Sequence, residues 1–155
     1  MNDDPLHFLI VEADFYKDIS DALVQGATAV LDAAGASYER LAVPGAFEIP
    51  AAIGMALRSR QFHSGEKRFD GYLALGCVIR GETSHYDHIC EESARALQSL
   101  ANTHSLALGS GVLTVETQEQ AWVRAAVDQR NKGGDVARAC LRMIAVKQRF
   151  HLHPR

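Results

Sequence analysis

Short apolar runs alternate along this chain with longer stretches in which apolar residues recur every three or four positions. The short runs are typical of strands, and they span residues 7–11, 38–43, 71–79 and 106–113. The longer stretches have the spacing of one helix face and predict helices near residues 19–34, 49–57, 86–101, 119–125 and 134–150. Gly35 and the pair Pro44-Gly45 stand where the first helix and the second strand should end.

The run from Gly71 to Ile79 has no charged residue, which is typical of a central strand buried on both faces. Alternation of strands and helices predicts a parallel sheet with helices on both sides. We therefore expect an α/β protein, a three-layer α/β/α sandwich with a central four-stranded parallel sheet. One domain should span residues 1–155, with a flexible N-terminus at 1–6 and a polar loop at 63–68.

Composition excludes several classes of protein. The formal net charge is −3 and the pI is about 6.1, which argues against a nucleic-acid partner. No apolar stretch approaches the roughly 18 residues of a membrane span, and the acidic start is unlike a signal peptide. The three cysteines include no C-x-x-C pair, so free buried thiols in a reducing cytoplasm are expected.

Ligands bind parallel sheets of this kind beyond the carboxyl ends of the strands. Four segments expected there carry unusual residues: 14–15, 43–50, 80–87 and 110–114. In the third, Gly81 allows a tight turn and Thr83 or Ser84 can cap the next helix, whose free N–H groups suit an anion. His85 would stand beside that site and could move protons. The alternative is an ordinary capped helix start with an exposed histidine.

Other residues at these ends leave two interpretations open. His88 could share a face with His85 and bind a metal, although no further ligands follow at suitable spacing. Arg80 could attract an anion or pair with a carboxylate such as Glu82. The rings of Phe15 and Phe47 could stack on a heterocycle or pack in the core.

The sequence also leaves open the roles of three charged residues. Glu48 lies between two prolines in an apolar run and could bind a ligand or favour a helix start. Arg124 and Lys132 lie eight residues apart around a predicted helix break, and are either surface charges or part of a site.

Together these segments resemble the lumazine synthase family over about residues 7 to 150. The similar stretches are VPGAFEIP at 43–50, ALGCVIRGETSHYD at 74–87, GVLT at 111–114, EQA at 119–121, and Arg124 with NKG at 131–133. The first two are very specific, and they come in the order and at the strand ends that the family shows.

The resemblance implies a flavodoxin-like fold and a defined reaction. The family condenses 5-amino-6-(D-ribitylamino)uracil with 3,4-dihydroxy-2-butanone 4-phosphate, releasing phosphate and water and leaving 6,7-dimethyl-8-ribityllumazine. This is the penultimate step of riboflavin biosynthesis, and it requires no metal or organic cofactor. Family members are homo-oligomers, either pentamers or 60-subunit shells of pentamers, with active sites between neighbouring subunits. No nucleic acid or membrane takes part.

The resemblance also implies roles for individual residues. The pocket for the pyrimidine ring and ribityl chain would consist of Phe15, Ala46, Phe47, Glu48, Cys77, Val78 and Ile79. The phosphate site would consist of Gly81, Glu82, Thr83 and Arg124, the last from the same or a neighbouring subunit. His85 would donate and accept protons, and Lys132 would contact the pyrimidine or a developing charge. Many members carry phenylalanine, which closes over the ring from the neighbouring subunit, where this chain has Ser110, and arginine where it has Asp14.

Two other functions compete with the synthase. One is a carrier that keeps the scaffold and binds a flavin or lumazine without making it, a function that the change at Ser110 favours. The presence of His85, Arg124 and Lys132 favours the enzyme. The other is a signalling receiver domain, which would need clustered aspartates that Asp14 alone does not supply.

Overall fold

Four parallel strands form the centre of the molecule. The computed structural model of the chain describes residues 4–63 and 69–153. The strands are β1 (His7–Ala13), β2 (Ser37–Val43), β3 (Gly71–Ile79) and β4 (Leu108–Val115), in the order β2-β1-β3-β4. β3 is an interior strand, as its uncharged sequence predicts, and its bounds agree with the predicted run.

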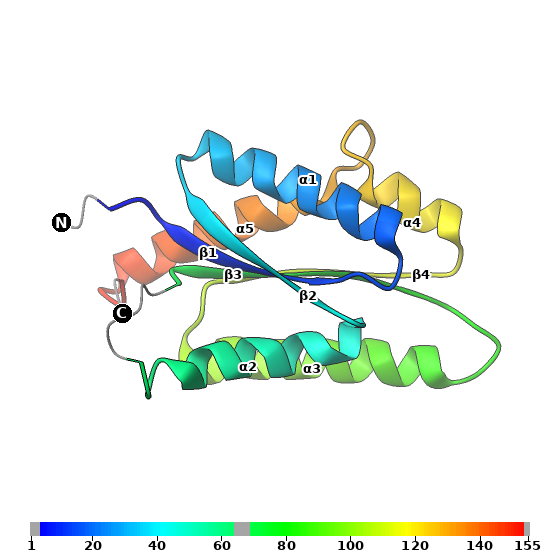
Figure 1. Cartoon of the computed structure of the whole chain (residues 1–155), viewed down its shortest axis with the longest axis horizontal. Coiled ribbons are helices and arrows are strands. Elements are labelled where there is room, and N and C mark those ends of the chain that lie inside the picture. The colour runs from blue at the N-terminus through cyan, green and yellow to red at the C-terminus, as the bar shows by residue number, and fades with distance from the viewer. Residues whose placement is uncertain (1–3, 64–68, 154–155) are drawn as a thin grey trace.

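Helices cover both faces of this sheet (Figure 1). One face carries α1 (Lys17–Ala33), α4 (Gln118–Ala125) and α5 (Lys132–Arg149). The other carries α2 (Ile49–Ser59), which follows the short 3-10 helix η1 (Ala46–Glu48), and α3 (His85–His104). The three-layer α/β/α fold is thereby confirmed, and Gly35 follows α1 with a φ of 70°, as its position predicts.

The predicted end of the first strand was wrong. β1 continues past Val11 to Ala13 although Glu12 carries a charge. Glu12 is only 5% exposed, and both of its carboxylate oxygens accept hydrogen bonds from Arg40 on β2, at 2.9 and 2.7 Å. A carboxylate paired in this bidentate way can lie inside the sheet layer, so the charge does not end the strand.

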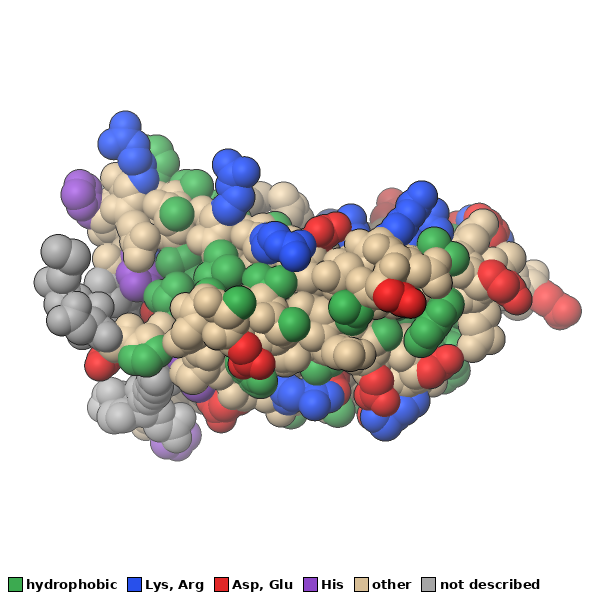
Figure 2. Space-filling view, turned by 90° about the horizontal axis from the view of Figure 1, so that it is seen from above, with side chains coloured by type: hydrophobic (Ala, Val, Ile, Leu, Met, Phe, Trp, Pro, Cys, Tyr) green, Lys and Arg blue, Asp and Glu red, His purple; other side chains and the backbone are tan. Residues whose placement is uncertain are grey.

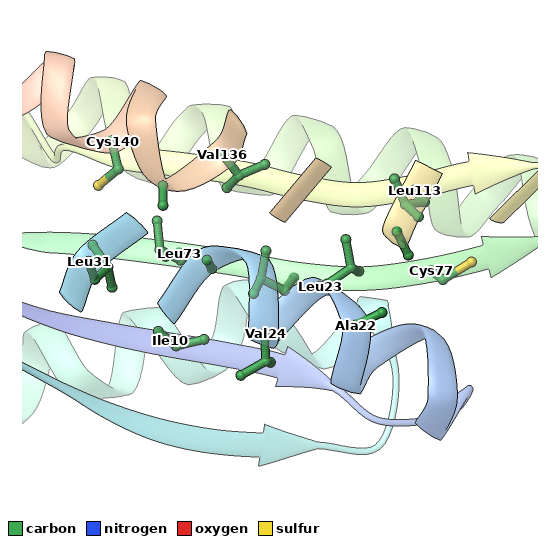
Figure 3. Packing of buried hydrophobic residues seen from close by; sticks show 14 of the residues in the cluster. Ile10, Ala22, Leu23, Val24, Leu31, Leu73, Cys77, Leu113, Val136 and Cys140 are labelled. Carbon is green, nitrogen blue, oxygen red and sulfur yellow. The ribbon is translucent and has the colours of Figure 1, made fainter. Parts of the chain in front are cut away.

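Apolar side chains of β1 and β3 fill both sides of the sheet. Ile10 and Leu73 pack under α1 and α5, together with Leu23 and Leu31 of α1 (Figure 3). The alternate strand residues face α2 and α3 and form a second cluster with side chains of these helices. The strands contribute Leu9, Val11, Tyr72 and Ala74, and the helices contribute Ile49, Ile53 and Leu97. Full burial of one such aliphatic side chain contributes about 1.5–3 kcal/mol, so these two layers hold the strand ends in place.

Two glycines of β4 bring it close to α5, and the strand ends two residues later than the predicted run of 106–113. A Cβ on Gly109 would lie 2.5 Å from the backbone oxygen of Val136, and one on Gly111 would lie 2.7 Å from its side chain. These glycines therefore allow α5 to pack closely on β4, which runs on to Val115.

Three smaller expectations have mixed outcomes. Cys77 and Cys140 are free and buried, but Cys90 is only half-buried, so the expectation of buried thiols is wrong for it. Residues 1–3 of the expected flexible N-terminus and 64–68 of the expected loop lie outside the described residues. No helix in the described ranges is long and apolar enough to cross a membrane.

Basic and acidic side chains are interspersed on the face of α1, α4 and α5 (Figure 2).

Candidate active site

A cavity of about 640 Å³ opens at the carboxyl edge of the sheet. It lies where β1 and β3 are neighbours but their following connections diverge, which is the usual ligand position in open α/β sheets. Four segments line it: Phe15 and Tyr16 after β1, residues 44–48 after β2, residues 77–79 at the end of β3, and Gly81, Thr83, His85, Tyr86, His88 and Ile89 beyond it.

Two aromatic rings of the cavity wall are exposed. Phe15 is 73% exposed and Phe47 is 55% exposed, so neither ring packs in the core. The ring of Phe15 meets that of Tyr16 edge to face, with 4.9 Å between their centroids. Exposed ring faces beside an apolar wall can stack on a planar ligand.

The apolar wall is the end of β3. Cys77, Val78 and Ile79 contribute to it, and Cys77 is only 7% exposed. Burial raises the pKa of its thiol to about 12. The side chain is therefore a neutral apolar surface at physiological pH and not a nucleophile.

Glu48 supplies the acidic side of the cavity. It stands at the N-cap position of α2 but makes no side-chain capping bond, and its side chain is exposed. No ion pair joins its carboxylate to a cation within residues 4–63 and 69–153. The carboxylate oxygens can therefore accept hydrogen bonds from a ligand that carries hydroxyl groups.

The connection between β3 and α3 brings a histidine to the cavity. Thr83 Oγ1 accepts a hydrogen bond from the backbone N–H of His85 at 3.3 Å, whereas Ser84 occupies the N-cap position without a side-chain bond. His85 is the first residue of α3, is exposed and lines the cavity. An imidazole in that position can exchange protons with a ligand.

Arg80 pairs with two carboxylates, neither of which is Glu82. Its Nε lies 2.9 Å from Oε2 of Glu116, and its Nη2 lies 3.3 Å from Oδ1 of Asp87. The guanidinium carbon also lies 4.3 Å from the ring centroid of Tyr86. Two hydrogen bonds raise the pKa of Arg80, the one to Glu116 having the larger effect and the one to Asp87 the smaller. The guanidinium therefore stays charged.

Four of the expected site residues do not line the cavity of this chain. Glu82 lies in the connection beside it, and Ser110 is exposed on the edge strand β4. Arg124, on α4, donates from Nη1 to the backbone oxygen of Gln120 at 3.0 Å. Lys132 is the exposed first residue of α5, on the opposite face of the sheet from α2 and α3.

Six further residues line the cavity although the resemblance implied no role for them: Tyr16, Pro44, Gly45, Tyr86, His88 and Ile89. His88 and Ile89 follow His85 at helical spacing, so their shared face was a usable signal. Within the described ranges, no group of three or more metal-ligating side chains includes His85 and His88.

Comparison with known proteins gives one consistent result. The family model described as 6,7-dimethyl-8-ribityllumazine synthase matches residues 5–148. A protein of that name, numbered 1, from Rhizobium meliloti (strain 1021) is 58% identical, over 94% of each chain. The Bartonella tribocorum protein of the same name is 54% identical, over 93% of this chain and 91% of its own. That of Agrobacterium fabrum is 53% identical, over 93% and 96%.

Proposed function

The chain belongs to the 6,7-dimethyl-8-ribityllumazine synthase family, and we propose that it condenses 5-amino-6-(D-ribitylamino)uracil with 3,4-dihydroxy-2-butanone 4-phosphate. The products are 6,7-dimethyl-8-ribityllumazine, phosphate and water, in the penultimate step of riboflavin biosynthesis. The observation that carries this proposal is that exposed aromatic rings, the exposed carboxylate of Glu48 and His85 line the same cavity.

The pyrimidine substrate fits the part of the cavity formed by β1, η1 and β3. Phe15 stacks on the pyrimidine ring, while Cys77, Val78 and Ile79 form the surface against which the ring lies. Glu48 accepts hydrogen bonds from the ribityl hydroxyls, beside Ala46 and Phe47. The exposure of both phenylalanine rings supports these roles, because a ring buried in the core would be unable to meet a substrate.

The butanone phosphate fits the connection between β3 and α3. Gly81, Glu82 and Thr83 precede the first turn of α3, where backbone N–H groups favour an anion. Arg124 adds a guanidinium, which pairs strongly with phosphate. Holding the phosphate charge makes the phosphate a better leaving group, and placing it beside the pyrimidine brings the reacting atoms together.

His85 moves the protons in this mechanism. The amine of the pyrimidine attacks the ketone and one water leaves, phosphate is then eliminated, and the second nitrogen attacks the remaining carbonyl and closes the ring with loss of a second water. Each of these steps transfers a proton, which a histidine does efficiently near neutral pH. The substrate supplies its own amine nucleophile, so the neutral thiol of Cys77 is not needed as one.

We further propose that residues 1–155 form a single domain that assembles as a cytoplasmic homo-oligomer, a pentamer or a 60-subunit shell of pentamers. In such an assembly a neighbouring subunit contributes Ser110, Arg124 and Lys132 to the cavity. Their positions away from the cavity of their own chain support this arrangement. The free thiols of Cys77 and Cys140 suit a reducing compartment.

The first test is a direct assay. Purified protein is mixed with both substrates, and the absorbance of the lumazine product is followed against the uncatalysed reaction. A clear excess rate is expected. Absence of any excess rate, with riboflavin or lumazine still binding, would replace the synthase with the carrier.

Replacing His85 tests the mechanism within an active enzyme. His85→Ala is expected to lower kcat by about 10²–10⁴, because the protein then lacks its proton donor and acceptor. The substitution removes an exposed side chain, so the melting temperature should stay close to that of the unchanged protein. An unchanged kcat would disprove the role of His85 while leaving the reaction itself intact.

A further inference from the structure

Arg80 directly precedes the segment 81–84, which connects β3 to α3. The backbone N–H of Arg80 donates to the backbone oxygen of Val115 at 2.9 Å, and this bond anchors the start of the segment on β4. The next backbone donor bonded to another residue's backbone is Asp87, whose N–H reaches the oxygen of Ser84 at 3.1 Å. Residues 81–84 are exposed, and none of their backbone N–H groups donates to a backbone oxygen among the described residues.

The side chain of Arg80 joins the two ends of this segment. It pairs with Asp87, which follows the segment in the first turn of α3, and with Glu116, which follows β4. Its guanidinium also lies over the ring of Tyr86, next to His85. One side chain therefore connects the end of β3, the end of β4 and the start of α3.

We propose that Arg80 is a positioning residue for the butanone phosphate. It holds segment 81–84 in the conformation that presents Gly81, Glu82 and Thr83 to the phosphate group, without touching the phosphate itself. This inference rests on the proposed function, because it assigns the phosphate to that segment. The pyrimidine part of the cavity comes from other segments, so its binding does not depend on Arg80.

The contacts of Arg80 should have a moderate effect on KM for the butanone phosphate. Each exposed ion pair contributes little alone, but two pairs and a ring contact acting on one short segment add together. Arg80→Gln is therefore expected to raise KM for the butanone phosphate about tenfold, equivalent to about 1.4 kcal/mol. KM for the pyrimidine should change less than about twofold, within the range of ordinary surface substitutions.

A control removes a comparable pair elsewhere. Arg138 and Asp135 on α5 form an exposed pair at 3.0 Å that does not line the cavity. Arg138→Gln is expected to leave both KM values unchanged. Equal changes of both KM values in Arg80→Gln, or no change of either, would overturn the proposal.

A double-mutant cycle separates positioning from direct phosphate binding. If Arg80 acts through Glu116, Arg80→Gln should raise KM for the butanone phosphate distinctly less in a Glu116→Gln background, by about threefold. If Arg80 binds the phosphate itself, its loss should have the full tenfold effect in that background, and the proposal fails. Lumazine formation by the unchanged protein is measured in parallel. Its absence would count against the proposed function, whereas its presence with no Arg80 effect counts against this inference alone.

Discussion

At the scale of single residues, the exposure of Phe15 supports its proposed role in stacking on the pyrimidine ring. A ring that is 73% exposed contributes little to folding, since burial is what stabilises an apolar side chain. Phe15→Ala is therefore expected to change the free energy of unfolding by less than about 0.5 kcal/mol. It should raise KM for the pyrimidine about two- to tenfold, the range that corresponds to loss of one aromatic stacking contact. Steady-state kinetics and urea unfolding measure the two effects.

Phe150 provides the matched control for this prediction. Its ring is 68% exposed, at the end of α5, and it does not line the cavity. Phe150→Ala should leave KM for the pyrimidine unchanged. A loss of about 3–5 kcal/mol of stability in Phe15→Ala would show instead that the ring is a core residue, and the stacking role would be wrong.

At the scale of elements, the close contact between α1 and α5 requires a glycine at position 133. A Cβ on Gly133 would collide with the backbone oxygen of Leu23 on α1. Asn131, with a φ of 47°, precedes it and accepts a hydrogen bond from the backbone N–H of Gly134 at 3.3 Å. Gly133 and Gly134 therefore lie inside the first turn of α5, which begins at Lys132 and not near residue 134 as predicted.

Gly133→Ala tests this packing. The added methyl group should force α1 and α5 apart and lower the free energy of unfolding by about 1–3 kcal/mol, measured by urea unfolding. Gly54→Ala in α2 is the control, because a Cβ there meets nothing within 4 Å. That change should stabilise the protein by about 0.5–1 kcal/mol, the usual gain from replacing a helical glycine. Equal effects of the two substitutions would contradict the packing argument.

The sequence predicts the elements well where one periodicity dominates. β3 has no charged residue, so its bounds could be predicted correctly. The end of β1 could not, because Glu12 is tolerated only through Arg40 on another strand. The start of α5 could not, because Gly133 is explained by α1, which lies more than a hundred residues earlier in the chain. Local sequence patterns therefore do not predict the end of an element when a contact with a distant part of the chain determines it.

The same reason limits prediction of the candidate site. Positions after strand ends could be predicted, since parallel topology brings them to one edge. The exposure of Phe15 and Phe47 could not, because an apolar ring alone favours the core. Nor could the partners of Arg80: sequence proximity suggests Glu82, but the geometry selects Asp87 and Glu116.

At the scale of the whole molecule, one chain brings together only part of the expected site. The cavity gathers His85 with the aromatic rings and Glu48, while Ser110, Arg124 and Lys132 lie elsewhere. Lys132 begins α5 on the far face of the sheet, and the packing of Gly133 against α1 fixes it there. If Lys132 acts in catalysis, it must therefore act in the cavity of a neighbouring subunit.

Mixed oligomers test this sharing of residues. His85→Ala and Lys132→Gln chains, each inactive or nearly so, are co-expressed with different tags and purified by both tags. In a shared site, one subunit supplies His85 and its neighbour supplies Lys132. Random mixing should therefore leave both residues intact in about a quarter of the sites, and activity should rise towards about a quarter of that of the unchanged protein. Co-expression of His85→Ala with the double variant is the control and should restore nothing. If the first pair also restores nothing although both chains co-purify, each chain uses its own Lys132, and the shared site is wrong.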